Sequence, residues 1–307
     1  MAFEINKILG IDNTSDLAKL ITRKDGGAFV REAENVDIDD EGMPHRRDGY
    51  GNIVVTSTGV QSLWSDGEVC LFVKKTSFYK LGKDFSTQTE LIYNVDPTDR
   101  MSYVSVGDRV YFSNNSINGY YSKQDGITHP FTNPSQTFKI QMIGGHILEY
   151  YNSRLYSARD RILFYSDATV IDRMDYRKNA IPFPNTITMV KAVKDGIYVG
   201  ILGNDDDSAA GVYFLGGNDP STFSMTRLLD TGPIDGMSIT VDGDNIGRGD
   251  SGKTVYWLAS DGIYKGYPEG HAIQMQEGLY TPEEFNAGTA IYMNRNGYGQ
   301  FLGIGQL

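Results

Sequence analysis

The strongest match to a catalytic motif lies at residues 247–254, which read GRGDSGKT and fit the G-x-x-x-x-G-K-[ST] pattern of a phosphate-binding P-loop. A working P-loop opens a helix, because backbone N–H groups and the helix N-terminus together hold the phosphates. The residues that follow, VYWLASDGIYKGYPEG, combine β-branched and aromatic residues with the turn signal Asp261-Gly262 and with Pro268. They predict a strand and a turn instead of a helix, and Asp250 would oppose a bound anion. We therefore interpret this string as a glycine-rich hairpin loop.

Other motifs in the chain are also better explained by turns than by sites. Residues 248–250 spell Arg-Gly-Asp, a string short enough to occur by chance. The spacing of Asp37, Asp39, Glu41 and Asp48 imitates a calcium-binding loop, but a strand is predicted where the flanking helix should be. The single cysteine, Cys70, permits neither an internal disulfide nor a cysteine zinc site.

The histidines and carboxylates indicate no catalytic centre. The four histidines are far apart and none has the spacing of metal ligands: His45, His129, His146 and His271. Residues 63–67, LWSDG, only partly match the aspartate box of sialidase propellers. We expect no cofactor, no metal and no enzymatic activity. A glycosidase stays open as an alternative, because it needs only two carboxylates at a suitable separation.

The one compact basic spot in the chain is His45 with Arg46 and Arg47. If it faces an acidic neighbouring subunit, it would dock there through paired charges, although a solvated turn is the more common case. Arg31, Arg46 and Arg47 are the candidate residues for docking a partner.

Composition favours an all-β protein that does not bind nucleic acid tightly. The chain has 307 residues with 20 Tyr, 14 Phe and 35 Gly, a mixture that suits strands joined by tight turns. Its 28 basic and 39 acidic residues give a net charge of −11, which argues against wrapping DNA but not against DNA passing nearby. The N-terminus is too polar for a secretory signal and no apolar run is long enough for a membrane span, so we expect synthesis in a cytoplasm.

Six stretches repeat the rhythm of two aromatic strands joined by a turn, and each predicts a β-hairpin. They are residues 66–81, 107–123, 152–168, 194–217, 252–266 and 288–305. Equivalent tyrosines are spaced by 45, 42, 58 and 36 residues, close to the repeat of a four-stranded propeller blade, at Tyr111, Tyr156, Tyr198, Tyr256 and Tyr292. The chain is predicted to be a β-propeller of six or seven blades, with a pair of packed β-sandwiches as the alternative.

The expected domain organisation is an N-terminal arm over residues 1–34, for docking or ring closure, and a propeller over residues 35–307. A propeller usually closes by pairing the two ends of its chain. The final strand, at residues 299–304, is therefore expected to pair with residues 33–38 or with a strand near residues 53–55.

Several phrases of the sequence resemble a family of tailed-bacteriophage virion proteins. The opening phrases are GIDN at residues 10–13, FVREAENVDIDDEG at 29–42 and RRDGY at 46–50. Later phrases are RILFYSD at 161–167, GVYFLGGNDPSTF at 211–223 and VYWLASDGIY at 255–264. This family is similar to the β-propeller hub or nozzle proteins in the lower part of short phage tails. The resemblance implies a ring of subunits around the channel through which DNA is ejected.

The function expected from the sequence is structural. The chain would be a tail hub, nozzle or neck (head-tail connector) subunit, made in the host cytoplasm and located in the virion tail. Its partners would be further copies of itself in a ring, other tail or connector proteins, and DNA that passes through the channel without specific binding; no membrane is expected. The alternative is a carbohydrate-binding or glycan-cleaving propeller at the tail tip.

Overall fold

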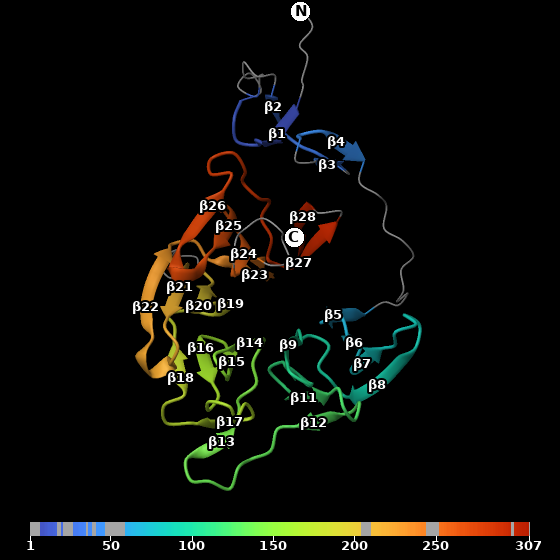
Figure 1. Cartoon of the computed structure of the whole chain (residues 1–307), viewed down its shortest axis with the longest axis vertical. Helices are drawn as coiled ribbons and strands as arrows, with labels where there is room; N and C mark the ends of the chain where they lie inside the picture. The colour runs from blue at the N-terminus through green and yellow to red at the C-terminus, as the bar shows by residue number, and fades with distance from the viewer. Residues whose placement is uncertain are drawn as a thin grey trace, which may run out of the picture.

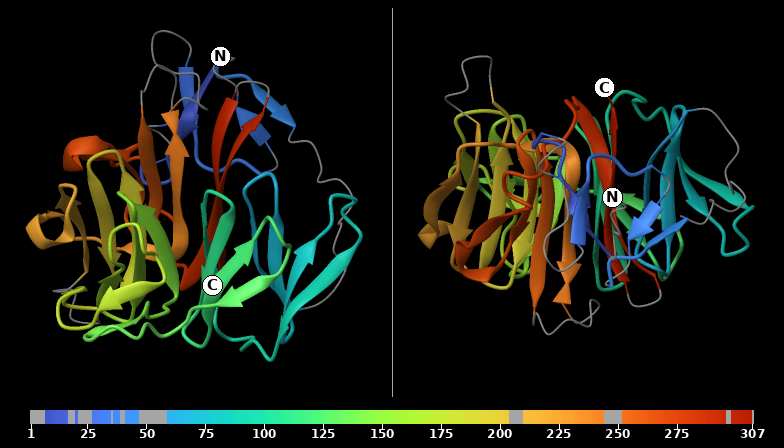
Figure 2. Two further views of the ribbon diagram at one scale, coloured as in Figure 1. Left: turned by 60° about the horizontal axis from the view of Figure 1, so that its bottom comes forward. Right: turned by 90° about the horizontal axis from the view of Figure 1, so that it is seen from above.

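The computed structural model describes residues 7–16, 20, 27–34, 36–38, 41–46, 59–203, 210–243, 252–295 and 298–306. Within these ranges the chain is almost entirely β-structure, and the two short helical turns are 3₁₀ turns: η2 (Pro220–Thr222) and η4 (Pro268–Gly270). Figures 1 and 2 show the sheets arranged side by side around a common centre. The predicted all-β propeller class is confirmed, and the sandwich pair is not formed.

The described propeller has five blades, of which four are four-stranded antiparallel sheets and the fifth is formed by four strands of a six-stranded sheet. Blade 1 comprises β5 (Val60–Ser65), β6 (Cys70–Lys74), β7 (Ser77–Leu81) and β8 (Gln88–Tyr93). Blade 2 comprises β9 (Ser102–Val106), β10 (Arg109–Ser113), β11 (Asn118–Ser122) and β12 (Thr128–Pro130). Blade 3 comprises β14 (Ile147–Tyr151), β15 (Arg154–Arg159), β16 (Ile162–Tyr165) and β18 (Ala180–Pro182). Blade 4 comprises β19 (Ile187–Val193), β20 (Gly196–Ile201), β21 (Gly211–Gly216) and β22 (Ser224–Leu229). Blade 5 comprises β23 (Pro233–Asp242), β24 (Lys253–Ala259), β25 (Gly262–Gly266) and β26 (Ala272–Met275).

The remaining strands form smaller two-stranded pairs. β13 (Lys139–Gln141) pairs with β17 (Arg173–Asp175) beside blade 3. β1 (Lys7–Ile11) and β2 (Gly27–Val30) are parallel, whereas β3 (Val36–Ile38) and β4 (Pro44–Arg46) are antiparallel. The last hairpin joins β27 (Ala287–Arg295) to β28 (Tyr298–Gln306).

All six predicted hairpins are present, and five of them are the middle strands of a blade. β6–β7, β10–β11, β15–β16, β20–β21 and β24–β25 each cover one predicted stretch. Their apolar side chains are buried on both faces; in β20, for example, every residue is buried. A strand that lies between two neighbouring sheets has no solvent face, so its residues form a continuous apolar run instead of alternating with polar ones.

The prediction of six or seven blades is wrong for the described residues, among which five blades form and the sixth hairpin has no outer strands. β27 pairs in parallel with β23 through Asp235 and Ala287, and β28 pairs only with β27 among the described strands. In Figures 1 and 2 this hairpin lies between blade 5 and blade 1, where a further blade would be expected. The hairpin therefore ends the described propeller with two strands.

The expected ring closure is also not formed by residues 33–38. β3 pairs with β4 in an antiparallel register, with Asp37 opposite His45. The other candidate partner of the last strand, near residues 53–55, lies outside the described residues.

The hydrophobic core consists of layers between neighbouring blades. Each of four clusters joins two consecutive blades, from blades 1 and 2 to blades 4 and 5. The largest buried side chains are aromatic, and Tyr156, Tyr198 and Trp257 are completely or almost completely buried. Aromatic side chains bury about 150–250 Å² each, so the aromatic positions of the repeat supply most of the contact between blades.

Polar side chains at the start of the first strand of each blade connect it to the next blade. In four cases a Ser, Thr or His side chain makes a hydrogen bond to the backbone of the following blade. The bonded residue lies in the first strand of that blade or directly before it. These bonds are Met101 N to Ser62 Oγ at 2.9 Å, Leu148 N to Ser102 Oγ at 2.9 Å, His146 Nε2 to Ile187 O at 2.7 Å, and Thr188 Oγ1 to Pro233 O at 2.8 Å. The four contacts fix the relative positions of all five blades.

Replacing Thr188 with valine tests the contribution of these bonds to stability. Thr188 is 5% exposed, and its hydroxyl donates to the Pro233 carbonyl of blade 5. Without the hydroxyl the carbonyl loses its partner, so Thr188→Val should lower the free energy of unfolding by about 1–2 kcal/mol, measured by urea denaturation. The control is Thr226→Val on the exposed surface of β22. Equal destabilisation by both variants would contradict the role of the bond.

Candidate functional site

The predicted docking residues belong to a unit that stands outside the blades. β1–β4 lie at one end of the molecule in Figure 1, away from the five sheets. Arg31 follows β2 and Arg46 is the last residue of β4; both side chains are exposed and make no ion pair with the described residues. Arg47 lies outside the described residues. The structure thus places two of the three predicted docking residues on the same projecting unit.

Several hydrogen bonds hold this N-terminal unit together and attach it to the propeller. The Ile8 amide donates to the Gly42 carbonyl at 2.7 Å, which joins β1 to the turn between β3 and β4. Gly42 has a φ of +82°, and a Cβ there would lie 2.8 Å from the Ile8 oxygen. The attachment to the propeller is made by Asn13, whose Nδ2 donates to the Thr281 carbonyl at 2.7 Å and whose Oδ1 accepts from the Thr281 amide at 2.9 Å.

The lysine of the string that resembles a P-loop begins a strand. Lys253 is the first residue of β24, which continues to Ala259, so no helix starts at the point where a P-loop requires one. Lys253 lines a surface pocket of about 420 Å³ together with Lys194 and Asp242. Residues 247–251 of the string, including Arg-Gly-Asp, lie outside the described residues, as do Asp39 and Asp48 of the calcium-like spacing.

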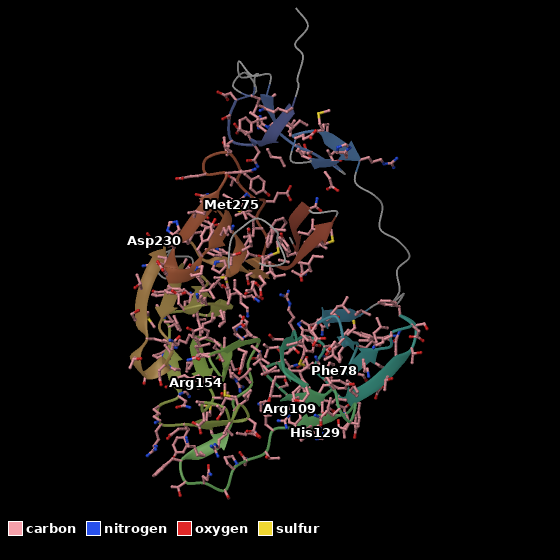
Figure 3. All side chains as sticks on the ribbon, viewed as in Figure 1. Phe78, Arg109, His129, Arg154, Asp230 and Met275 are labelled. Atoms are coloured by element: carbon pink, nitrogen blue, oxygen red, sulfur yellow. The ribbon has the colours of Figure 1, made fainter. Side chains whose placement is uncertain are left out.

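The histidines and acidic residues do not assemble a metal centre in the described part of the chain, where no group of three or more potential ligands is found. His129 stacks on Tyr120 with ring centroids 4.9 Å apart and bonds to Asp125 at 2.8 Å. Arg109 lies over the same tyrosine ring, 4.4 Å from its centroid (Figure 3). This group holds together the strands of blade 2.

Asp66, in the segment that partly matches an aspartate box, connects blades 1 and 2. Its carboxylate accepts from Lys123 Nζ at 2.7 Å and from Ser105 Oγ at 2.8 Å, both on blade 2, and from the Val69 amide at 3.0 Å. Partial burial raises the pKa of Asp66, but the hydrogen bonds from Lys123 and Val69 outweigh it and hold this pKa well below its ordinary value. The carboxylate is fully used in the structure, so we assign it a structural role.

The same type of contact recurs at two further blade boundaries. Asn152, in the turn after the first strand of blade 3, donates to the Asn218 carbonyl after β21 at 2.6 Å. Asp195, in the corresponding turn of blade 4, accepts from the Glu269 amide of blade 5 at 2.8 Å. These turns join neighbouring blades at the C-terminal ends of the first strands. The bonds of Ser62, Ser102, His146 and Thr188 join them near the N-terminal ends.

Two pockets occupy equivalent places between blades, and sequence reasoning missed both. The first, of about 350 Å³, is formed by the β10–β11 turn, residues 140–144 and Arg159 at the end of β15. The second, of about 450 Å³, is formed by residues at the ends of β20 and β21, residues 230–234 and Ser260 after β24. The dense asparagine run of residues 114–118, NNSIN, was the signal in the sequence that could have identified the first pocket.

The sequence and the structure together indicate no membrane-spanning helix. None of the described segments forms a helix long and apolar enough to cross a bilayer.

Replacing Asp66 with asparagine tests its role through the pH dependence of stability. Because the folded-state pKa is lowered, the charged carboxylate stabilises the fold above the unfolded pKa of about 4, and this contribution is lost as pH falls through the folded pKa. Asp66→Asn should therefore lower the free energy of unfolding by about 2 kcal/mol at neutral pH. The difference from the parent protein should shrink as the pH falls below about 4. Denaturant titrations across this range measure it. The control is Asp230→Asn, because Asp230 is 92% exposed; a pH-independent effect of Asp66→Asn would contradict the assignment.

Comparison with known proteins supports the fold. No family model matches the chain, and a search of curated proteins gives no match. Hydrazine synthase of Kuenenia stuttgartiensis superposes with a TM-score of 0.51 at 10% identity, over 80% of this chain and 77% of that chain. Virginiamycin B lyase from Staphylococcus aureus gives 0.47 at 12% identity, over 80% and 84%. The Pan2 WD40 domain of Neurospora crassa gives 0.46 at 10% identity, over 71% and 66%. Identities this low show the fold alone, and the match to hydrazine synthase agrees with the β-propeller seen in the arrangement of the blades.

Proposed function

We propose that the chain is a non-enzymatic structural subunit of a tailed-phage virion, repeated in a ring around the path of the DNA in the tail hub, nozzle or neck. The observation that carries the proposal is the N-terminal unit. The phrases at residues 10–13 and 29–42, which resemble the phage family, belong to a unit that folds outside the blades and exposes Arg31 and Arg46. A surface of this kind suits contact with a neighbouring subunit.

A ring of copies requires two different surfaces on each subunit, because a head-to-tail contact repeated by rotation is heterologous. The N-terminal unit lies at one end of the molecule, and the β13–β17 pair lies at the other end in Figure 1. Beside this pair, Phe138 and Tyr176 are exposed and contact each other, and the guanidinium of Arg177 lies 3.8 Å from the centroid of the Phe138 ring. Exposed aromatic residues and arginine are typical of binding hot spots. The two ends therefore provide candidate surfaces for the two sides of the contact.

The DNA path in this proposal is the centre of the ring of subunits and not the centre of one propeller. The first strands face the centre of the propeller, and Arg100, before blade 2, reaches Asp235 of β23 at 3.9 Å. A net charge of −11 disfavours tight DNA contact, which suits a wall along which a polyanion slides.

The test is to look for the chain in virus particles. A lysate of cells that carry the gene is banded on a density gradient, and the particles are examined by mass spectrometry and electron microscopy. We expect the chain in several copies per particle and its density in the tail or neck. Tailed particles that lack the chain would overturn the proposal.

Reversing the charge of the two docking residues tests the N-terminal unit directly. Arg31→Glu with Arg46→Glu should reduce incorporation about tenfold, equivalent to roughly 1.4 kcal/mol, because a partner that pairs with the arginines would then meet like charges. The measurement is the amount of variant in gradient-purified particles. Lys83→Glu with Arg161→Glu makes the same change of charge at exposed positions on blades 1 and 3 and serves as the control. Normal incorporation of the Arg31 and Arg46 variant would exclude docking through these residues.

A further inference from the structure

The pocket between blades 2 and 3 has a composition unlike that of the rest of the chain. It measures about 350 Å³, and the residues that line it are Asn114, Asn115, Ser116, Ile117, Asn118, Asn133, Ile140, Gln141, Met142, Ile143, Gly144 and Arg159. The chain has 39 acidic residues, yet none of the described lining residues is acidic. Among the described lining residues, Arg159 alone is charged. The pocket is therefore suited to an anionic ligand in an otherwise acidic protein.

Asn114 presents a buried hydrogen-bond donor without a partner. Asn114 is 1% exposed, and its Oδ1 accepts from the Ser116 amide at 2.9 Å and from the Ile117 amide at 2.8 Å. These two backbone donors fix the orientation of the side-chain amide, since a flipped Nδ2 would face two N–H groups. The Nδ2 itself is buried and finds no acceptor in the described part of the chain. A buried donor left unpaired is costly, and this one has no surface open to a ligand oxygen. It acts on the pocket only through the positive end of its N–H dipole.

Arg159 supplies the positive charge of the pocket. It is the last residue of β15, its side chain is exposed, and it makes no ion pair or side-chain hydrogen bond with the described residues. The planar guanidinium offers two parallel N–H groups, which match the two oxygens of a carboxylate. Asp99 lies close to the pocket, where its carboxylate accepts from Asn115 Nδ2 at 3.4 Å and from Ser116 Oγ at 3.1 Å. These neutral donors orient the carboxylate without removing its negative charge.

The other lining groups suit a hydroxylated ligand. Side-chain amides both donate and accept hydrogen bonds, as sugar hydroxyls do. Asn118 donates through Nδ2 to the Met142 carbonyl at 2.7 Å, which leaves its Oδ1 as an acceptor for a ligand hydroxyl. Ile117, Ile140 and Ile143 add an apolar wall that suits the C–H groups of a sugar ring. A volume near 350 Å³ lies at the small end of ligand pockets, which fits a monosaccharide better than a larger ligand.

We propose that this pocket binds a hexuronic acid, either free or as the terminal residue of an acidic polysaccharide. The carboxylate lies against the Arg159 guanidinium, and the ring hydroxyls bond to the amide side chains that line the pocket. This inference goes beyond the structural role and does not depend on ring formation. The described lining of the equivalent pocket between blades 4 and 5 contains Asp230, which Figure 3 labels, and no arginine, so we do not assign it the same ligand.

Calorimetric titration of the full chain tests the proposal with glucuronate and galacturonate as free ligands and trigalacturonate as the polysaccharide end. At least one should bind, whereas glucose, which lacks the carboxylate, and acetate, which lacks the hydroxyls, should bind at least tenfold more weakly. Binding of trigalacturonate alone would identify a polysaccharide as the source of the ligand. Failure of all three uronates to bind would overturn the proposal, and so would acetate binding as tightly as the uronates.

Two variants locate the bound carboxylate. Arg159→Gln removes the charge, and Asn114→Asp keeps the Oδ1 acceptor of the turn while replacing the donor with a second carboxylate oxygen. Each should weaken uronate binding at least tenfold. Arg161→Gln is the matched control, because it removes the same charge from the same turn outside the pocket lining. Thermal unfolding of each variant verifies folding, and unchanged affinity in a folded Arg159→Gln variant would exclude this site.

Discussion

The propeller depends on contacts between neighbouring blades more than on contacts within them. A single four-stranded sheet cannot bury both of its faces, so each blade requires a neighbour on either side. Here the four principal buried clusters each join two consecutive blades, and aromatic residues such as Tyr156, Tyr198 and Trp257 fill the layers. Apolar layers alone do not fix the relative register of adjacent sheets, because the hydrophobic effect is not directional. The directional part comes from the hydroxyl, imidazole and carboxylate contacts at both ends of the first strands.

These directional contacts explain why the conspicuous polar motifs of the sequence do not form catalytic sites. Asp66 has the surroundings of a functional carboxylate, with a cation, a hydroxyl and backbone amides around it, yet all of these groups come from the blade boundary. His146 likewise uses its Nε2 to reach the Ile187 carbonyl of the next blade. A side chain whose hydrogen bonds hold two blades in register is not available for a substrate. The polar groups that remain without partners, such as Asn114 Nδ2, are then the more informative ones.

Features that depend on local interactions could be predicted from the sequence, whereas features that depend on contacts between distant residues could not. The six hairpins were predicted correctly, because alternating aromatic strands and glycine turns are local features. The number of blades was not predicted correctly, because it depends on whether each hairpin is joined by two further strands. For residues 288–305, nothing in the sequence of the hairpin reveals that β28 has no further partner among the described strands. The pocket between blades 2 and 3 combines residues 114–118 with Arg159, which lie more than 40 positions apart in the chain. Only the fold brings them together.

The attachment of the N-terminal unit differs physically from the contacts that build the propeller. Asn13 bonds to both the amide and the carbonyl of Thr281, so one side chain takes the place of a strand in a backbone pairing. Thr14 adds a hydrogen bond from Oγ1 to the Gly278 carbonyl at 2.6 Å. None of the four buried layers between consecutive blades includes a residue of this unit. A unit held chiefly by polar contacts can change its position at a smaller cost in free energy than a blade can, because little apolar surface is exposed when it moves. The blades are therefore joined by buried apolar layers, whereas the N-terminal unit is joined to the propeller by the hydrogen bonds of Asn13 and Thr14.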